Sequence, residues 1–369
     1  MKILVTGGHL TPALAVIQKI PKNVEVIYVG RKFALEGDTG VSLEYQTIAS
    51  LNIPFIIFHP GRLQRKFTKY TVPALARIPK SIVQAIRILR REKPTVVLSF
   101  GGHVAFPICL AAAMLHIPFV IHEQTLEAGG TNRILARLAT KICVSWESSL
   151  QFFPKEKTVL TGNPLLPSQP SQEIQEIVQK KMTAYPILTI TGGSLGSHAI
   201  NVLIEPIIKK LLAKYFIIHQ TGDAQQFKDF DTIENIKSSL PYTFQERYIV
   251  RKFISPDDIA FVYNSSDLVV SRSGINTVLA LLLGNIPSLL IPLPHSQRQE
   301  QYKNADFLQK SGLGQVLLQD DLTSERLLNT IGVMMKNRTM YANNNLSDMQ
   351  RLHKHAAEKI LQVVYDTQA

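Results

Sequence analysis

The segment "ILVTGGHLTPALAV", residues 3–16, indicates how this 369-residue chain folds. An apolar run ends in two glycines, and an apolar pattern with helical spacing follows at once. Glycine after a buried strand lets the backbone adopt positive φ and lets a ligand approach the chain closely. A helix that starts there presents unpaired N–H groups that favour phosphate. The segment therefore predicts the first strand, turn and helix of a phosphate-binding α/β domain.

The rest of the chain repeats this alternation in two series. Strands are expected at 2–5, 24–29, 95–99, 118–122, 141–144 and 158–160, and, after a Pro-, Ser- and Gln-rich linker at 161–172, at 186–190, 216–219, 248–250, 268–270 and 288–291. Such alternation predicts parallel sheets covered by helices. We expect an α/β protein with two Rossmann-like doubly wound domains facing a central cleft, at residues 1–163 and 164–345. Residues 346–369 are expected to form a helix that returns to the first domain.

The two halves also resemble each other. "TGG" occurs at 6–8 and again at 191–193, and "SFGG" at 99–102 corresponds to "SRSG" at 271–274. These offsets fit duplication of one domain type. Neither half contains the strict G-x-G-x-x-G dinucleotide fingerprint or a G-x-x-x-x-G-K-[ST] loop. Glycine turns needed only for tight strand–helix packing therefore remain an alternative. Pro206 falls inside an expected helix and predicts a bend there.

Composition limits the partners and the compartment. The formal net charge of +12 favours an anionic partner, which includes nucleic acid, nucleotide phosphates and an acidic membrane surface. Cys109 and Cys143 lie in apolar contexts, so we expect no disulfide framework and a reducing cytoplasm. An expected strand at residue 2 leaves no room for a signal peptide. Residues 99–121 lack charged side chains, but their glycines, prolines and histidines favour a helix followed by a buried strand over a membrane span.

Polar side chains gather near the strand ends of the second half. Arg272 and Ser273 follow a predicted buried strand, Thr277 lies at a helix start, and His295 and Gln301 lie beyond the next strand. Ligand sites of open α/β sheets form at the carboxyl ends of the strands. The second half is therefore expected to bind the main ligand.

These motifs together carry a family resemblance. The chain contains "TGGHLTPALAV" from Thr6, "SFGGHVAFP" from Ser99, "HEQTLEAGGTNRILARLA" from His122, "TGNP" from Thr161, "GGSLGSHAIN" from Gly192, "SRSGINTV" from Ser271 and "IPLPHSQRQEQYKNA" from Ile291. In this order and spacing it resembles the MurG family, which transfers N-acetylglucosamine (GlcNAc) from UDP-GlcNAc to lipid I and so makes lipid II for peptidoglycan. The resemblance implies a GT-B glycosyltransferase fold and an inverting single displacement onto the C4 hydroxyl of undecaprenyl-pyrophosphoryl-MurNAc-pentapeptide.

Inversion needs a base for the acceptor proton but no protein nucleophile. By resemblance His9 is the candidate base, and its alternative role is binding of diphosphate or acceptor. Glu123 in "HEQ" is the rival base, and its alternative role is that of a structural carboxylate near a helix start. His122 and His103 are expected to be structural histidines.

The resemblance also implies the donor-binding set. Ile254 is expected to meet the uracil, Gln301 the sugar, and Asn132 the donor or acceptor sugar, while the loop 192–196 and Arg272 carry the diphosphate charge. The full set is Thr6, Gly7, Gly8, Thr125, Asn132, Gly193, Ser194, Ile254, Arg272, Ser273, Gly274, Thr277 and Gln301. We expect neither a cofactor nor a bound metal, since the acidic pairs at 229–231, 257–258 and 320–321 are typical of polar loops or helix starts.

Four departures from the family pattern concern donor binding. The first glycine loop is shortened, and Thr125 stands where an asparagine is usual. Leu166 replaces an arginine, and Ala280 replaces the glutamate expected to hold the ribose. Losing these polar contacts weakens donor binding by several kcal/mol, on the order of 1–3 kcal/mol each, unless Glu300, Arg298 or Glu127 substitutes.

Residues 61–94 carry ten Lys or Arg and one acidic residue, interleaved with apolar and aromatic side chains. This mixture favours peripheral contact with the cytoplasmic face of an anionic membrane. The expected contact residues are Arg62, Lys66, Phe67, Lys69, Tyr70, Arg77 and Lys80. The alternative is a solvated basic helix packed on the core through Ile82, Val83, Ile86 and Leu89. Nucleic acid is disfavoured because no recognition motif accompanies the charge.

The expected partners are UDP-GlcNAc, lipid I, the membrane surface and other cell-wall synthesis proteins. Two other functions stay open. One is a GT-B enzyme that uses UDP-GlcNAc for epimerisation or for a different acceptor. The other is a non-catalytic sugar-nucleotide-binding scaffold, which the changes at Leu166 and Ala280 keep under consideration.

Overall fold

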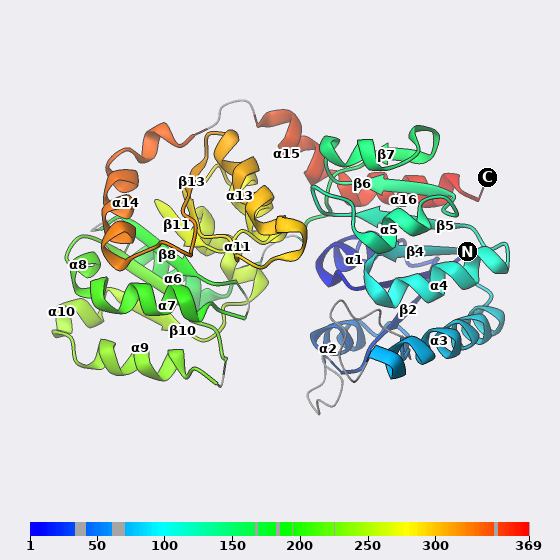
Figure 1. Ribbon diagram of the computed structural model, residues 1–369, viewed down its shortest axis with the longest axis horizontal. Helices are drawn as coiled ribbons and strands as arrows, with labels where there is room; N and C mark the ends of the chain where they lie inside the picture. The colour runs from blue at the N-terminus through cyan, green and yellow to red at the C-terminus, as the bar shows by residue number, and fades with distance from the viewer. Residues whose placement is uncertain are drawn as a thin grey trace. The chain divides into compact units, whose positions relative to one another are not determined.

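The computed structural model describes residues 1–33, 42–60, 71–166, 169–181, 185–193, 195–224, 226–342 and 346–368, with backbone alone at 43, 71–78, 180–181 and 297. The chain forms two compact units. Unit 1 comprises residues 1–166 and 351–369, and unit 2 comprises residues 167–350. Each unit is a parallel sheet with helices on both faces (Figure 1).

Unit 1 contains a seven-stranded sheet in the order β3-β2-β1-β4-β5-β6-β7, with every pairing parallel. Its strands are β1 (Lys2–Gly7), β2 (Glu25–Gly30), β3 (Phe55–Ile57), β4 (Val96–Phe100), β5 (Phe119–Glu123), β6 (Lys141–Val144) and β7 (Thr158–Leu160). The first six follow the strand order of a doubly wound nucleotide-binding domain. In such a domain the order in which strands are added to the sheet reverses between β1 and β4.

Helices cover both faces of this sheet. They are α1 (Leu10–Ile17), α2 (Leu43–Ser50), α3 (Thr71–Glu92), α4 (Gly102–Met114), α5 (Gly130–Leu135) and α16 (Ala356–Asp366), with 3₁₀ turns at Glu147–Phe152 and Lys155–Lys157. One apolar cluster joins the sheet to α1, α2 and α16, and a second joins it to α3, α4 and α5. Alternate residues of β1 supply the two clusters, Ile3 the first and Leu4 the second, because successive strand side chains point to opposite faces.

Unit 2 has the six-stranded order β10-β9-β8-β11-β12-β13, also parallel throughout. Its strands are β8 (Ile187–Thr191), β9 (Phe216–Gln220), β10 (Tyr248–Arg251), β11 (Leu268–Ser271), β12 (Ser288–Leu290) and β13 (Gly314–Val316). Renumbered from its own first strand, this is the same 3-2-1-4-5-6 order as in unit 1. The repetition of topology supports the duplication inferred from the sequence.

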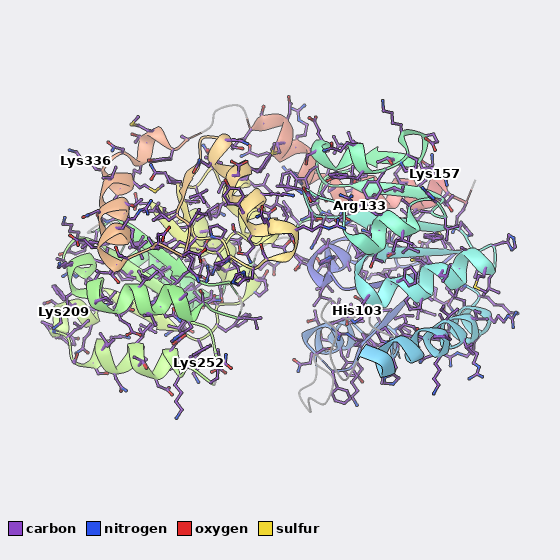
Figure 2. The ribbon with its side chains drawn as sticks, viewed as in Figure 1. His103, Arg133, Lys157, Lys209, Lys252 and Lys336 are labelled. Atoms are coloured by element: carbon purple, nitrogen blue, oxygen red, sulfur yellow. The ribbon has the colours of Figure 1, made fainter. Side chains whose placement is uncertain are left out.

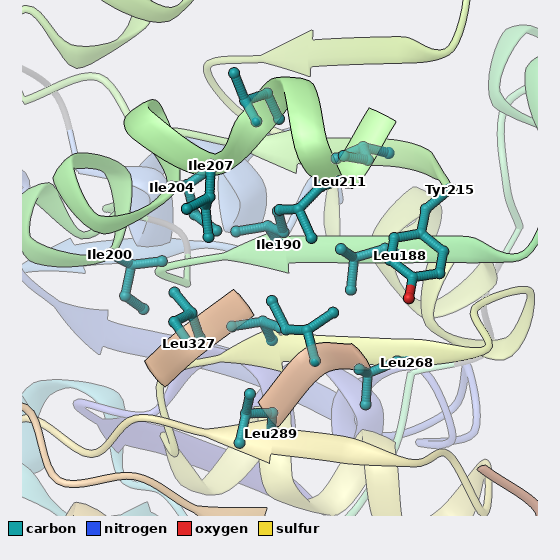
Figure 3. Close-up of a cluster of buried hydrophobic side chains, with 14 of the residues drawn as sticks. Leu188, Ile190, Ile200, Ile204, Ile207, Leu211, Tyr215, Leu268, Leu289 and Leu327 are labelled. Atoms are coloured by element: carbon teal, nitrogen blue, oxygen red, sulfur yellow. The ribbon is translucent and has the colours of Figure 1, made fainter. Parts of the chain in front are cut away.

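The helices of unit 2 are α6 (Gln172–Lys181), α7 (His198–Ile204), α8 (Ile208–Leu212), α9 (Asp229–Ser238), α10 (Tyr242–Gln245), α11 (Pro256–Asn264), α12 (Ile275–Leu283), α13 (Glu300–Lys310) and α14 (Ser324–Lys336), with 3₁₀ turns at Glu205–Ile207 and Gln297–Gln299. Its largest apolar cluster packs α7, α8, α9 and α14 on one face of the sheet, and Figure 3 shows Leu188, Ile204, Leu211 and Leu327 within it. The other face carries α6 and α11.

The structure confirms the two Rossmann-like domains and the expected strands, with small shifts at their ends. Two strands were missed, β3 and β13. Each has only three residues, is partly exposed and lies at a sheet edge, so its hydrophobic pattern is too short to recognise. A bend was predicted at Pro206, and the structure interrupts the helix there: α7 ends at Ile204 and a 3₁₀ turn precedes α8. How the two units face each other, and hence the central cleft, stays a prediction.

The C-terminal helices join the chain end to unit 1. α15 (Ser347–Lys354) begins at Ser347, and α16 packs against α1 and β6. Residues 99–121 form the end of β4, α4 and β5, as their interrupted pattern predicted. Among the helices of the described ranges, none is long and apolar enough to span a membrane. Cys109 and Cys143 are buried free thiols, and burial raises the pKa of each to about 12.

Candidate active site

Two glycine turns lie against each other at the carboxyl edge of the unit 1 sheet. Gly7 has a φ of +150°, and a Cβ there would lie 2.8 Å from the backbone of Phe100. Gly8 N–H donates to the carbonyl of Gly101 at 2.9 Å. A Cβ on Gly102, which has a φ of +79°, would lie 3.3 Å from Gly8 Cα. The turns after β1 and β4 therefore meet with no room for a side chain between them.

Part of the expected donor set is used inside this sheet. Thr6 is fully buried, and its hydroxyl donates to the carbonyl of Val29 in β2 at 2.9 Å. Gly7 is the last residue of β1, and the Gly8 N–H is already paired. The structure therefore gives Thr6 and Gly7 a packing role, and only Gly8 is exposed at this turn.

His9 lies at the mouth of the first turn, as the sequence suggested, and is the N-terminal cap residue of α1. Its Nδ1 lies 2.7 Å from Nε2 of Gln124, which follows β5. Burial lowers the pKa of His9, and the nearby charge of Glu123 opposes this effect. The imidazole is thus neutral near pH 7, as a base must be before it accepts a proton.

Glu123, the rival base, is buried at the end of β5 and both of its carboxylate oxygens are paired. Oε1 accepts the backbone N–H of Thr125 at 3.1 Å, and it competes with the carbonyl of Glu127 for the single hydrogen of the Thr125 hydroxyl. Oε2 accepts the backbone N–H of Gly129 at 2.8 Å and the side-chain amide of Asn132 at 3.0 Å. The three N–H donors hold the segment 124–132 in place, so the geometry favours the structural alternative for Glu123.

Thr125 and Asn132 both donate hydrogen bonds to the carboxylate of Glu123. Asn132 is buried, and its amide also donates to the carbonyl of His122 at 3.2 Å. Its Oδ1 has no partner among the described residues and lies 3.4 Å from where a Cβ on Gly101 would be. A buried acceptor without a partner costs stability, and Oδ1 of Asn132 shares this property with Oε1 of Gln124 in the same segment.

His122 has a structural environment, as expected. It is buried, its Nε2 lies 3.3 Å from the carbonyl of Gly162 and 3.1 Å from the hydroxyl of Ser145, and burial lowers its pKa to about 3. His103 lies in the first turn of α4 and is labelled in Figure 2.

The glycine loop of unit 2 follows β8. A Cβ on Gly192 would lie 2.1 Å from the N atom of Ser197, and one on Gly196 would lie 2.0 Å from the carbonyl oxygen of Thr221. Gly193 differs, because a Cβ there would meet no atom within 4 Å. Gly192 and Gly196 are thus required by close packing, whereas Gly193 faces open space. Ser194, expected to bind the donor, lies outside the described residues.

Arg272 is a buried cross-link between loops. Its Nε donates to Ser197 Oγ at 3.1 Å, and its Nη1 donates to the carbonyls of Ile291 and Pro292 at 3.0 and 3.2 Å. Its Nη2 donates to Gln319 Oε1 at 2.6 Å, and burial lowers the pKa of Arg272 to about 10. Because four of its five N–H groups are paired within unit 2, the guanidinium mainly fixes the loops after β8, β12 and β13.

Ser273 and Gln301 link the loop after β11 to α13. Ser273 is fully buried and donates to the carbonyl of Gln301 at 2.7 Å, and Asn304 donates to the carbonyl of Ser273 at 3.0 Å. Gln301 Oε1 accepts the backbone N–H of Leu293 at 3.0 Å. The partly exposed amide of Gln301 is therefore held at the edge of the sheet rather than mobile.

The remaining residues expected to bind the sugar donor lie near the carboxyl edge of the unit 2 sheet. Gly274 is the N-terminal cap residue of α12, and a Cβ there would meet no atom within 4 Å. Thr277, in the first turn of α12, hydrogen-bonds with Tyr263. Ile254 is buried, and its backbone N–H donates to Gln220 Oε1 at 3.2 Å, while Gln220 Nε2 donates to the carbonyl of Gly193 at 2.7 Å.

Two of the departures have a structural explanation. Leu166, where the family has an arginine, packs against the apolar cluster that contains α1 and α16. Thr125 satisfies Glu123, as described above. Ala280 lies in α12 and is partly exposed, and a substitute for the missing carboxylate stays a prediction.

Sequence reasoning did not use three polar groups that the structure shows at these edges. Gln124 contacts His9, and Gln220 connects the loops at Gly193 and Ile254. His198 Nδ1 lies 2.7 Å from Oδ1 of the buried Asp229. Each is a polar residue at the end of a buried strand or at a helix start, so position alone could have drawn attention to it.

Most of the expected membrane residues cannot be placed. Arg62, Lys66, Phe67, Lys69 and Tyr70 lie outside the described residues, and Arg77 is described by its backbone alone.

Lys80 is exposed on α3, as are Arg87 and Arg90. The alternative that α3 is a packed basic helix is correct for Leu89, which is fully buried, but wrong for Val83, which is 46% exposed. The described part of α3 therefore has a packed face and a face that carries basic side chains with one apolar side chain.

Two Rossmann-like sheets with glycine loops at their carboxyl edges are typical of nucleotide-binding enzymes, and two family models assign this chain to the glycosyltransferases. The model of the glycosyltransferase family 28 N-terminal domain matches residues 5–144, and that of the family 28 C-terminal domain matches residues 187–362.

The names of similar proteins identify the family within the glycosyltransferases. The chain is 32% identical over 352 residues to the UDP-N-acetylglucosamine--N-acetylmuramyl-(pentapeptide) pyrophosphoryl-undecaprenol N-acetylglucosamine transferase of Clostridium novyi, and 33% identical to that of Clostridium kluyveri. Each alignment covers 93% of this chain and 93% of the relative. The chain belongs to this family of transferases, the MurG family.

Solved structures agree with this assignment. MurG of Acinetobacter baumannii superposes with a TM-score of 0.70 at 25% identity and covers 99% of both chains. The UDP-GlcNAc 2-epimerase of Neisseria meningitidis, at 14% identity and a TM-score of 0.64, covers 99% of this chain and 100% of its own. The second similarity shows the shared fold alone.

Proposed function

We propose that this chain transfers GlcNAc from UDP-GlcNAc to the C4 hydroxyl of undecaprenyl-pyrophosphoryl-MurNAc-pentapeptide. In the transfer, the acceptor oxygen forms a bond to C1 of GlcNAc while the bond from C1 to the β-phosphate oxygen breaks. The electron pair leaves with UDP, and the acceptor proton passes to a base. The relatives are named for this reaction, and they align over 93% of the chain.

His9 is the base in this proposal. It is partly exposed at the turn after β1, its imidazole is neutral near pH 7, and only Nδ1 has a described partner. Glu123 is a positioning residue, since three N–H donors already occupy its carboxylate. General bases typically contribute about 10²- to 10⁴-fold to a rate.

Unit 2 binds the donor in this proposal. Gly193 and Gly274 both face open space, so a ligand can approach the backbone after β8 and at the start of α12. The nine-residue helix α12 begins there with no acidic residue in its first turn, which favours phosphate. The remaining N–H of Arg272 Nη2 adds one charged donor. We propose that these groups carry the leaving diphosphate without a protein-bound metal, and chelation with EDTA tests this.

Access to a lipid-linked acceptor requires contact with a membrane surface. We propose that the basic face of α3 provides part of it, on the cytoplasmic side where UDP-GlcNAc is available. Lys80, Arg87 and Arg90 are exposed on the described part of this helix, beside the exposed Val83. Each basic residue near an anionic surface contributes about 1 kcal/mol.

The observation that carries the proposal is the placement of His9, the cap residue of α1, beside the glycine turns that follow β1 and β4, in a chain of this family. Purified protein, radiolabelled UDP-GlcNAc and a lipid I analogue test it, with His9→Ala as the variant. We expect a lipid II-like product and its near loss in the variant.

The other two functions predict different results in the same assay. UDP-ManNAc formed without an acceptor would indicate an epimerase. UDP binding without any product would indicate a scaffold. Either result would overturn the proposed transfer.

A further inference from the structure

The contact between Gln124 and His9 determines which nitrogen of His9 carries the proton. A neutral imidazole has one N–H and one lone pair. If the Gln124 amide nitrogen donates to Nδ1, the proton of neutral His9 lies on Nε2, and Nε2 cannot accept another. If the Gln124 amide oxygen faces His9 instead, it accepts from Nδ1–H, and Nε2 holds the lone pair.

The two orientations differ by a half-turn of the Gln124 amide, and no described hydrogen bond of this side chain besides the one to His9 favours either. Gln124 is buried, and its Oε1 has no partner among the described residues when Nε2 faces His9. A half-turn leaves the amide nitrogen in that same position, so each orientation makes one bond to His9. The oxygen and nitrogen of an amide are distinguished only by such partners.

The backbone of Gln124 is fixed, so the half-turn involves the side chain alone. Trp146 Nε1 donates to the Gln124 carbonyl at 2.9 Å. On either side, Glu123 and Thr125 are held by the bonds described above. The amide therefore stays within reach of His9 in both orientations.

We propose that Gln124 is a second positioning residue of the transfer, and that in the reactive state its amide oxygen accepts from His9 Nδ1–H and leaves Nε2 free to take the acceptor proton. The proton from the acceptor hydroxyl then resides on Nε2, and the imidazolium keeps its Nδ1–H bond to Gln124 until the proton is released to solvent. This inference rests on the proposed role of His9 as base.

Other titratable groups near His9 must be considered for any pH effect. Glu123 and His122 lie on β5. The charge of Glu123 raises the pKa of His9, and the charge of protonated His9 lowers the pKa of His122. His103 is in the first turn of α4, next to the Gly102 that meets Gly8. On α16, which packs against α1, Glu358 pairs with Lys19 at 2.9 Å, beyond the far end of α1. Glu123 is paired and His122 is held neutral, so the amide of Gln124 is the direct partner to vary.

The test measures the pH profile of kcat/KM for Gln124→Leu and Gln124→Glu. We expect Gln124→Leu to lower kcat at least about tenfold with KM for UDP-GlcNAc unchanged, because the tautomer is no longer set. A carboxylate in Gln124→Glu can only accept from Nδ1–H, so it restores activity and moves the acid limb to higher pH by about one unit or more. Gln151→Glu, an exposed position with the same charge change, is the control and leaves the limb in place.

A second measurement does not depend on turnover. With ¹⁵N-labelled histidine, the His9 nitrogen signals, assigned with His9→Gln, report the tautomer directly. We expect the Nδ1–H form to dominate in Gln124→Glu.

An unshifted acid limb in Gln124→Glu, or wild-type kcat in Gln124→Leu, overturns this inference while leaving His9 as base. Full activity of His9→Ala overturns the base role itself, so the two failures are distinguishable. If Gln124→Leu does not fold, the Gln124→Glu profile and the nitrogen signals decide.

Discussion

Buried histidines make this protein sensitive to acid, and His353 offers the clearest test. It lies on α15, is 1% exposed, and its Nδ1 accepts the backbone N–H of Asn163 at 2.8 Å. Its ring centroid is 4.8 Å from that of Trp146. Burial lowers its pKa from 6.5 to about 4. Protonation would also place a hydrogen on Nδ1, which then could no longer accept the Asn163 N–H.

The sign and size of the effect follow from linkage. Below pH 6.5 the unfolded chain binds a proton at this site and the folded chain does not, so stability falls as pH falls and levels off near pH 4. For a pKa of 6.5 unfolded and about 4 folded, lowering the pH from 7 to 5 costs about 2 kcal/mol. His122 and His219, each with a pKa lowered to about 3 by burial, add about 2 kcal/mol apiece over the same range.

The assay is urea unfolding at pH 7 and pH 5 of the wild type, of His353→Gln and of the exposed-site control His59→Gln. Glutamine does not titrate, so we expect His353→Gln to be less stable at pH 7 but to lose about 2 kcal/mol less than the wild type on acidification. The control should follow the wild type. Parallel losses in the wild type and His353→Gln would refute the reasoning.

Three further changes test the site and the surface. Gly196→Ala places a Cβ 2.0 Å from a backbone oxygen at a φ of +75°, so unit 2 should lose at least about 2 kcal/mol, and an unchanged melting temperature would contradict this. Glu123→Gln turns an acceptor into a donor facing donors and should lower stability by about 2 kcal/mol, whereas a loss of activity at unchanged stability would favour Glu123 as the base. Replacing Lys80, Arg87 and Arg90 by serine should weaken binding to phosphatidylglycerol vesicles by about 3 kcal/mol in cosedimentation, and equal binding would exclude α3.

The local pattern of apolar residues, glycines and prolines was sufficient to predict the two parallel-sheet domains. All strands except β3 and β13 were recognisable in the sequence as buried apolar runs. The glycine turns follow two of these strands at the positions where parallel sheets bind ligands. Pro206 marked the break between α7 and α8 because its ring cannot continue a helix. β3 and β13 were missed because three half-buried residues carry too little periodicity.

The roles of the site residues depend on hydrogen-bond partners that are distant in the sequence, so the local sequence pattern could not predict these roles. Motifs pointed to His9, Glu123 and Arg272, yet nothing in "HEQ" distinguishes a base from an anchor. That distinction lies in the three N–H donors around Glu123 and in the loops that Arg272 connects.

The sequence by itself determined the two doubly wound sheets, the position of the glycine turns and the family, because strand periodicity and motif order are properties of the chain alone. The tertiary structure decided which polar groups remain available for chemistry. His9 and Gln124 are 115 residues apart and meet only because β1 and β5 end at the same edge of one sheet. Hydrogen bonds are short and directional, so the role of each side chain is set by the fold that brings its partner within 3 Å.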